Sequence, residues 1–350
     1  MLPKYDVLNT SNHADDNSRD DRKWRPDVSV YQKRLQGKPV KKLMKFDKLE
    51  LPIELKPRHC NDPFEDSPQG SDPAEYQFQP DNGIQNRGQL VAVLTELSAR
   101  QFRTHAFLVS LDSQEVRFIR NDRCGLVVTE AINYRVKSKS LAEFFLRFNE
   151  MSDAERGWDP TVRVATENST MAKLARKKLE SYCAKTETYK AKLKRPVVII
   201  TVPGGNEGKE RQVYGWHSFS DPESLTGRGT RGHPVYDPTD DRVYFLKDMW
   251  RCEQLEPEYD ILHYLNQKEV PHVPRIIAGG DLSGVLHHTR TQEFFGESWQ
   301  IGRVGSDGYD GLDRRIQHRL LEDLIDARIW DCSDARNMMA LVHHAFIGAF

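Results

Sequence analysis

The pattern of apolar and polar positions predicts a chain built from both strands and helices. Apolar runs between turn residues predict strands at 28–31, 49–55, 106–111 and 115–119, and the last two form a hairpin across Asp112-Ser113. Apolar residues at helical spacing predict amphipathic helices over 89–101 and 141–149. The sequence therefore predicts an α+β fold.

Three polar stretches separate these elements. Residues 1–25 are rich in Asn, Asp and Ser, and we expect a disordered tail there. Residues 60–86 predict a long loop. Residues 171–195 are strongly basic with interspersed leucines, which favours the solvated face of a linking helix, because Glu180 and Glu187 interrupt the charge. The alternative for this run is a surface that follows a phosphate backbone.

Composition narrows the function classes without choosing one. The 51 Lys and Arg residues against 52 Asp and Glu residues give a net charge of -1, so neither nucleic acid nor membrane binding is implied globally. The five cysteines are scattered without a CxxC pair, and the paired histidines 287–288 and 343–344 lack further ligands at metal-binding spacing. No segment approaches the length of a membrane span. We expect a soluble intracellular protein, cytoplasmic or nuclear.

A glycine-rich segment carries the main chemical signal. Gly227, Gly229 and Gly232 are followed by Lys247 and then by Glu258. A dinucleotide-binding turn needs a helix directly after the glycines, whereas here a strand, a polar turn at 237–241 and a second strand at 242–246 follow. Glycines allow backbone N–H groups to approach phosphates, and a strand-borne lysine needs a carboxylate to orient it. The alternative for Lys247 is a surface residue at a strand end.

Four segments resemble the fungal-type protein kinase family. They are 225–232 (LTGRGTRG), 245–250 (FLKDMW), 273–281 (VPRIIAGGD) and 288–291 (HTRT). The resemblance implies a kinase-like amino lobe that binds ATP with Mg²⁺, with the glycines and Lys247 as ATP-binding residues and Glu258 as the partner of Lys247. It also implies a strand at 319–325 that leads into the hinge, and phosphoryl transfer to protein Ser/Thr hydroxyls. The polar glycine-rich stretch 305–311 departs from the family pattern.

Two features lead us to expect a catalytically incomplete kinase, that is, a pseudokinase. After Glu258 the sequence contains neither His-Arg-Asp nor Asp-Phe-Gly, which would supply the base and the metal ligands. An apolar helix over 335–350 is the last element, and we expect a truncated product without a carboxy lobe. A non-catalytic interaction protein, whose partner covers this helix, is a further interpretation.

The first part of the chain carries a second hypothesis. Asp27 follows Pro26 before one strand, Glu54-Leu55-Lys56 ends another, and a helix and a strand follow, an order that resembles the PD-(D/E)xK nuclease core. In that fold an aspartate and a glutamate hold Mg²⁺ or Mn²⁺, and the lysine positions the attacking hydroxide. Alternation places Glu54 and Lys56 on one strand face. The alternative is a structural relative in which these two form an ion pair.

The predicted organisation is therefore a two-domain chain. We expect the disordered tail over 1–25, a PD-(D/E)xK-like α/β module over 26–165, a basic linking helix over 166–195, and a kinase-like amino lobe with the first carboxy-lobe helices over 196–350. The expected partners are a nucleotide and a protein substrate. Nucleic acid is implied only by the nuclease hypothesis.

Overall fold

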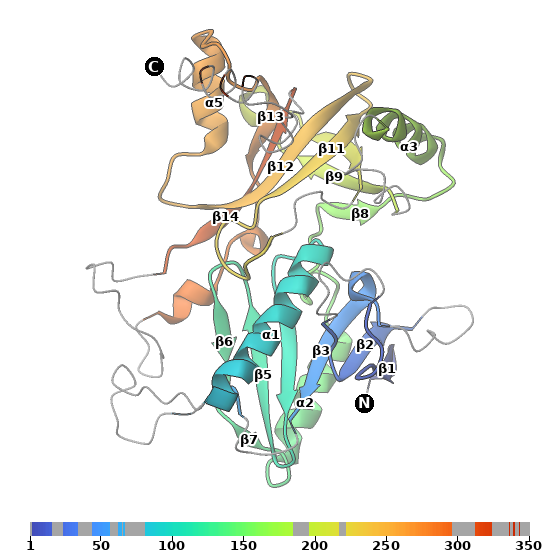
Figure 1. The fold of residues 1–350 in the computed structure, drawn as a ribbon, viewed down its shortest axis with the longest axis vertical. Helices are drawn as coiled ribbons and strands as arrows, with labels where there is room; N and C mark the ends of the chain where they lie inside the picture. Colours follow the sequence, from blue (N-terminus) through green and yellow to red (C-terminus); the bar gives the residue numbers. More distant parts are fainter. Residues whose placement is uncertain are drawn as a thin grey trace. The chain divides into compact units, whose positions relative to one another are not determined.

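The chain folds into two units, each containing a sheet and helices (Figure 1). The computed structural model describes residues 2–15, 24–33, 44–56, 62–64, 66, 81–184, 196–216, 222–295 and 312–323, together with residues 336, 339 and 343. Unit 1 consists of Met1–Pro160, Pro222–Gly229 and His288–Arg314, and unit 2 consists of Thr161–Asp221, Thr230–His287 and Arg315–Phe350. The predicted α+β class is confirmed at this level.

Unit 1 is built on a mixed sheet. Its strands are β1 (Tyr5–Asn9), β2 (Val28–Gln32), β3 (Leu49–Leu55), β4 (Ala106–Leu111), β5 (Glu115–Asn121), β6 (Leu126–Val128) and β7 (Ile132–Asn133). Strands β1, β2 and β3 form an antiparallel meander. Helix α1 (Asp81–Arg100) then crosses over, so that β4 pairs parallel to β3, and β5 returns antiparallel.

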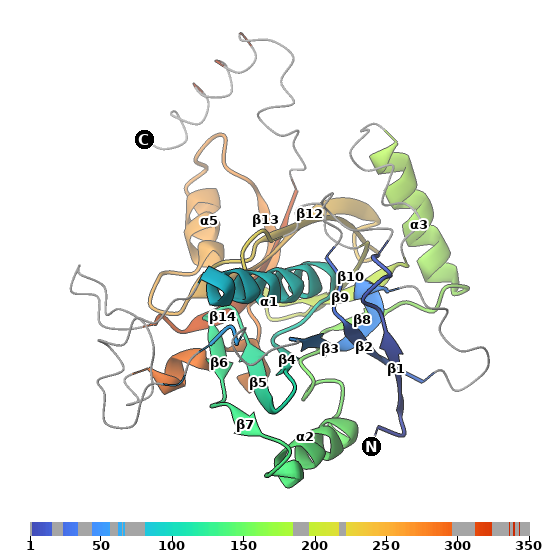
Figure 2. The same cartoon turned by 60° about the horizontal axis from the view of Figure 1, so that its bottom comes forward.

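Two helices cover the two faces of this sheet (Figure 2). Helix α1 buries the predicted apolar stripe, which includes Leu90 and Leu97, against Leu108 and Ile119 of the sheet. Helix α2 (Ser138–Glu150) packs Phe148 and its neighbours against the opposite face, which includes Val109. Successive strand residues point to opposite faces, so β4 contributes Leu108 to one core and Val109 to the other.

The expectation of a disordered tail over 1–25 is wrong for its first part. Residues Tyr5–Asn9 form β1 and pair along their whole length with β2. The Tyr5 side chain is buried, and its ring lies 5.7 Å from the ring of Phe148 on α2. Strand pairing and this aromatic contact stabilise a segment that polar composition alone assigns to disorder.

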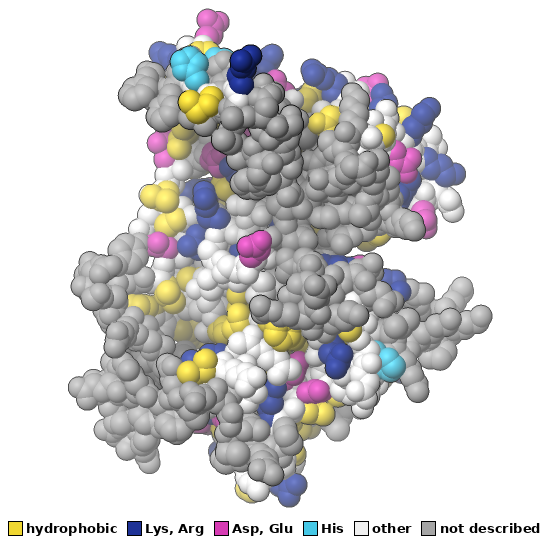
Figure 3. Space-filling view, in the orientation of Figure 1, with side chains coloured by type: hydrophobic (Ala, Val, Ile, Leu, Met, Phe, Trp, Pro, Cys, Tyr) yellow, Lys and Arg dark blue, Asp and Glu magenta, His cyan; other side chains and the backbone are white. Residues whose placement is uncertain are grey.

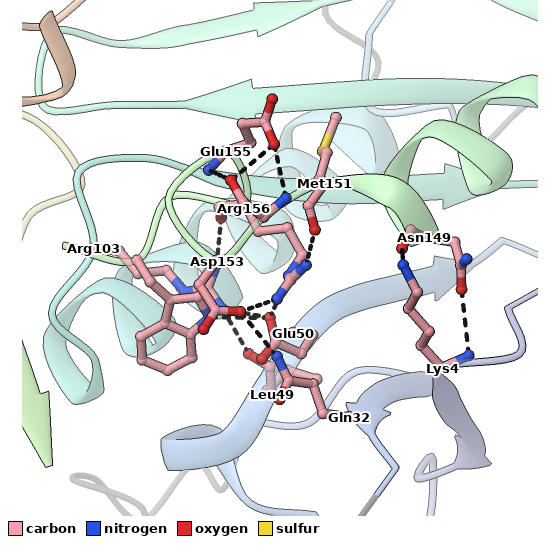
Figure 4. A network of polar contacts seen from close by, with 12 residues as sticks. Lys4, Gln32, Leu49, Glu50, Arg103, Asn149, Met151, Asp153, Glu155 and Arg156 are labelled. Carbon is pink, nitrogen blue, oxygen red and sulfur yellow. Dashed lines mark hydrogen bonds and ion pairs between the residues drawn. The ribbon is translucent and has the colours of Figure 1, made fainter. Parts of the chain in front are cut away.

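A buried carboxylate on β3 connects this strand to residues after α1 and after α2 (Figure 4). Glu50 Oε2 accepts hydrogen bonds from Arg103 Nη2 at 3.4 Å, Arg156 Nε at 3.2 Å and Trp158 Nε1 at 3.0 Å. The Arg103 guanidinium also lies 4.2 Å from the centre of the Trp158 ring. Burial lowers the pKa of Arg103 to about 10, which leaves it charged at neutral pH. Glu50 is therefore shared by two buried cations, and Arg156 also pairs with the exposed Asp153.

Unit 2 is built on an antiparallel sheet. Its strands are β8 (Val162–Val164), β9 (Val198–Val202), β10 (Arg211–Gly215), β11 (Arg231–Asp237), β12 (Arg242–Cys252), β13 (Ile276–Asp281) and β14 (Arg315–Glu322). Their order is β13-β14-β12-β11-β10-β9-β8. Strands β11 and β12 form the hairpin that the sequence predicts after the glycines. Strand β14 begins earlier than the predicted strand at 319–325, and residues 324 and 325 lie outside the described residues.

Two helices pack on the unit 2 sheet. Helix α3 (Thr170–Cys183) begins at Ser169, whose side chain accepts from the Ala172 N–H at 3.2 Å. It buries small residues and Leu179 against Trp216 and Tyr236, so the part of the basic segment within α3 packs on unit 2, with Lys173 exposed. Residues 185–195 lie outside the described residues. Helix α5 (Glu258–Gln267) packs against β12 and β14. The stretch 305–311 and almost all of 335–350 lie outside the described residues.

The Glu50 network generates a stability prediction. Glu50→Ala leaves Arg103 buried without this anion and leaves Arg156 only its pair with the exposed Asp153, and we expect the free energy of unfolding to fall by about 3–5 kcal/mol. The control is Glu143→Ala, because Glu143 forms an exposed pair with Arg147 on α2 and such pairs contribute less than about 1 kcal/mol. Urea unfolding followed by circular dichroism measures both. Equal losses in the two variants would contradict a structural role of the network.

Candidate functional site

A partly exposed ion pair joins β12 to α5 in unit 2. Lys247 Nζ donates to Glu258 Oε1 at 2.5 Å. Lys247 lies opposite Gly232 on β11 and opposite Leu320 on β14, so antiparallel strands flank it on both sides. Its side chain is 24% exposed and that of Glu258 is 31% exposed. The ammonium is therefore held by a carboxylate and remains accessible to an anionic ligand.

Helix α5 is anchored at the turn that carries Glu258. The backbone N–H of Tyr259 donates to His318 Nε2 at 3.4 Å, and His318 Nδ1 lies 2.7 Å from Asp281 Oδ1. Because Nε2 accepts, Nδ1 carries the proton and donates to Asp281. Burial alone would raise the pKa of Asp281, but hydrogen bonds from Arg251 and His318 hold it well below its usual range. The Asp281–His318 pair thus fixes the start of α5.

A second carboxyl shares the sheet face of Lys247. Glu322 pairs with Phe245, and Leu320 pairs with Lys247, so the alternation of both strands places Glu322 diagonally from Lys247 on one face. Glu322 is 7% exposed. Burial raises the pKa of Glu322 to about 7. The charge of Lys247 lowers this pKa, and the charge of Glu258 raises it. The sequence analysis missed this residue, because only the pairing of β12 with β14 brings it to the site.

The three glycines do not lie in one unit. Gly227 has a φ of 85° and Gly229 a φ of 50°, values that favour glycine, and both belong to the segment Pro222–Gly229 of unit 1. Gly232 lies within β11 of unit 2. The structure therefore brings Gly232, Lys247 and Glu258 together in unit 2.

The residues of the nuclease hypothesis also lie together, in unit 1. Asp27, just before β2, accepts the N–H of Leu55 through Oδ2 at 2.8 Å. Lys56 Nζ lies 3.7 Å from Glu54 Oε2, so the two side chains share a strand face as predicted. Gln89 of α1 joins them: its Nε2 donates to Glu54 Oε2 at 3.0 Å, and its Oε1 accepts from Lys56 Nζ at 2.7 Å. The sequence analysis missed Gln89, because the helical pattern shows only that it is a polar position beside Leu90.

Burial dominates the electrostatics of this cluster. Glu54 is 0% exposed, and burial raises the pKa of Glu54 to about 8, while Lys56 lowers it and Asp27 raises it further. Its Oε1 has no hydrogen-bond partner. Within the described ranges, no three His, Cys, Asp or Glu side chains gather in a geometry that would hold a metal ion. The cluster therefore offers two carboxyl groups, of which Glu54 is mainly protonated at neutral pH, together with one lysine and one amide.

Comparison with known proteins identifies the family. The profile described as fungal protein kinase matches residues 77–306, more than half of the chain. The chain belongs to this family. The match includes α1, β4, β5, α2 and the site residues of unit 2 up to Glu258, so it spans parts of both units, whereas Asp27, Glu54 and Lys56 precede it. The family region thus begins well before residue 196, where we expected the kinase-like lobe to begin.

No curated protein and no solved structure matches the chain. None of the helices in the described part of the chain is both long and apolar enough to cross a membrane.

Glu322 predicts a pH-dependent stability. In the folded chain its pKa is raised to about 7 from an ordinary value of 4.5, so the unfolded chain releases this proton first as pH rises. As the pH rises from 5 to 8, the free energy of unfolding of wild type should therefore fall relative to that of Glu322→Gln, by a difference on the order of 3 kcal/mol. Denaturant unfolding at several pH values measures this difference. Glu293→Gln, at an exposed position, should show none, and a pH-independent difference for Glu322→Gln would contradict the prediction.

Proposed function

We propose that the chain binds ATP through unit 2 in the manner of a protein kinase amino lobe. The observation that carries the proposal is the Lys247–Glu258 ion pair between a central strand and the helix beside it. In kinases this pairing orients the lysine toward the α- and β-phosphates, and it must be in place for activity. By family resemblance, Gly232, which lies opposite Lys247 on β11, supplies backbone that approaches the phosphates.

The described residues support nucleotide binding more fully than phosphoryl transfer. Transfer to a Ser/Thr hydroxyl needs a base for the substrate proton and ligands for Mg²⁺. The 350 residues contain neither His-Arg-Asp nor Asp-Phe-Gly, the motifs that supply these groups in protein kinases. The proposal for these 350 residues is nucleotide binding without phosphoryl transfer, as in a pseudokinase.

ATP binding should depend on Lys247. Lys247→Met removes the ammonium that meets the phosphates, and we expect ATP affinity to fall about tenfold or more, as measured by isothermal titration calorimetry. Glu258→Gln should weaken binding in the same direction. Lys268→Met is the control, because Lys268 is an exposed lysine at the far end of α5.

Two outcomes would contradict this function. Equal ATP affinity of wild type and Lys247→Met would remove the role of the ion pair. Transfer of labelled phosphate to a protein substrate by purified wild type, lost in Lys247→Met, would show that the 350 residues form a complete kinase site.

A second candidate function, metal-dependent phosphodiester cleavage in unit 1, is favoured by the convergence of Asp27, Glu54 and Lys56. Mg²⁺ is held in many proteins by one or two carboxylates and several waters, and Glu54 Oε1 is a buried oxygen without a hydrogen bond. The donor set fits such an ion once Glu54, whose pKa burial raises to about 8, loses its proton. When bound, the ion would lower the pKa of a water. Asp27 and Glu54 would hold it, and Lys56 would stabilise charge on the phosphate.

The geometry also supports the structural alternative. Lys56 is 8% exposed and donates to Gln89, so the lysine of the strand-face pair already has a hydrogen-bond partner within the fold. On the face shown in Figure 3, Lys and Arg side chains lie among Asp and Glu side chains, which fits the near-zero net charge. Nucleic acid would have to be recognised locally at this cluster.

Metal titration separates the two interpretations. If unit 1 is a metal site, wild type should bind Mn²⁺ by calorimetry, and Asp27→Asn should lose this binding because one of two carboxylate ligands is removed. Lys56→Ala should retain the metal but lose cleavage of DNA or RNA. Asp6→Asn, on β1, is the control. Absence of Mn²⁺ binding to wild type would leave the structural ion pair.

A further inference from the structure

The face of the unit 2 sheet that bears Lys247 is covered on one side of this lysine by α5. Phe245, Lys247 and Met249 share the face because they alternate along β12. Met249 is 3% exposed and packs with Leu262 of α5. Phe245 is partly exposed, and Glu322 of β14 lies directly opposite it. A ligand that extends from Lys247 along this face therefore runs over Phe245 and Glu322.

The Glu322 carboxyl is a buried polar group that accepts no hydrogen bond from the described part of the chain. On its other side β13 places the apolar Ile276 opposite it. Three charged groups act on it: Lys247 of β12 lowers its pKa, and Glu258 of α5 and the adjacent Asp323 raise it. Most buried carboxyl groups in folded proteins have a hydrogen-bond partner, and a ligand bound along this face would supply one.

Adenine has the chemistry that matches Phe245 and Glu322. A base can stack on the partly exposed ring of Phe245. Adenine presents a ring nitrogen that accepts beside an amino group that donates, and a protonated carboxyl presents an O–H that donates beside a carbonyl that accepts. A carboxylate only accepts, so it matches the edge of guanine on which N1–H and the amino group both donate.

We propose that Glu322 selects the base of the bound nucleotide by hydrogen-bonding to the edge of adenine. This proposal rests on the proposed ATP binding and names a specificity-determining residue of the same site. Burial raises the pKa of Glu322 to about 7, so the carboxyl is largely protonated at pH 6 and largely ionised at pH 8. The preference for adenine over guanine should therefore fall as the pH rises.

The test measures ATP and GTP binding to the full chain by calorimetry at pH 6 and at pH 8. The readout is the ratio of the two affinities, because the phosphates titrate alike in both nucleotides and their effect cancels. For wild type we expect the ratio of ATP to GTP affinity to fall about tenfold from the lower to the higher pH. Glu322→Gln keeps one donor beside one acceptor at every pH, so its ratio should not change.

Two further variants control for stacking and for net charge. Phe245→Leu removes the aromatic ring, so it should weaken both nucleotides and keep the pH dependence of their ratio. Glu210→Gln removes an exposed acid just before β10 and should retain the affinities and the pH dependence of wild type.

The outcomes distinguish base selection from nucleotide binding itself. If wild type binds ATP with a ratio that does not change with pH, the selecting role of Glu322 is wrong, while the proposed function stands. A pH dependence that Glu322→Gln retains, or that Glu210→Gln also loses, would overturn this role as well. Unchanged affinities in Phe245→Leu would show that the ligand does not follow this face. If wild type binds neither nucleotide, the proposed function fails and base selection fails with it.

Discussion

The assembly of unit 1 depends on the hydrogen bonds that the turn after β5 makes. Asp122 Oδ2 accepts the N–H groups of Arg290 at 2.8 Å and Thr291 at 3.0 Å, and the neighbouring Arg123 holds the glycine segment. Burial alone would raise the pKa of Asp122, but backbone N–H donors, including those of Arg290 and Cys124, lower it below its usual value. Two adjacent side chains therefore bind two segments that are far away in sequence. Unit 1 is discontinuous for this reason.

The discontinuity fits the extent of the fungal protein kinase region. The matched residues 77–306 include the turn and both of the segments that it holds. A division of the chain into a nuclease-like first half and a kinase-like second half separates groups that hydrogen-bond to one another. The turn after β5 thus belongs to the same family region as Lys247 and Glu258.

The two charged clusters differ in exposure, and their energetics differ accordingly. The Lys247–Glu258 pair is partly exposed, and such a pair contributes little to stability, about 0–1 kcal/mol, so it is suited to ligand binding. The Glu54–Lys56 pair is buried, where desolvation opposes the attraction and the Gln89 hydrogen bonds compensate. The first cluster can exchange a protein partner for a phosphate at low cost. The second needs a strong ligand to displace its internal contacts.

The sequence by itself determined the local elements and the spacing of the kinase residues. Alternation and helical periodicity located β3, β4, α1 and the β11–β12 hairpin, because backbone geometry imposes these periods on any segment with one buried face. The glycine segment with Lys247 and Glu258 was recognisable because each residue type performs a defined step in phosphate binding. The pairing of Lys247 with Glu258 was predicted, and its distance of 2.5 Å agrees.

The tertiary structure decided which distant residues meet. Strand β1 was missed because its stability comes from pairing with β2, which composition does not encode. Gln89, Glu322 and Arg123 were missed because each reaches its site through long-range packing: α1 against β3, β14 beside β12, and the turn after β5 against residues 224–227. Local sequence sets the direction of a side chain from its own backbone. The neighbours that it meets depend on contacts between segments far apart in the chain.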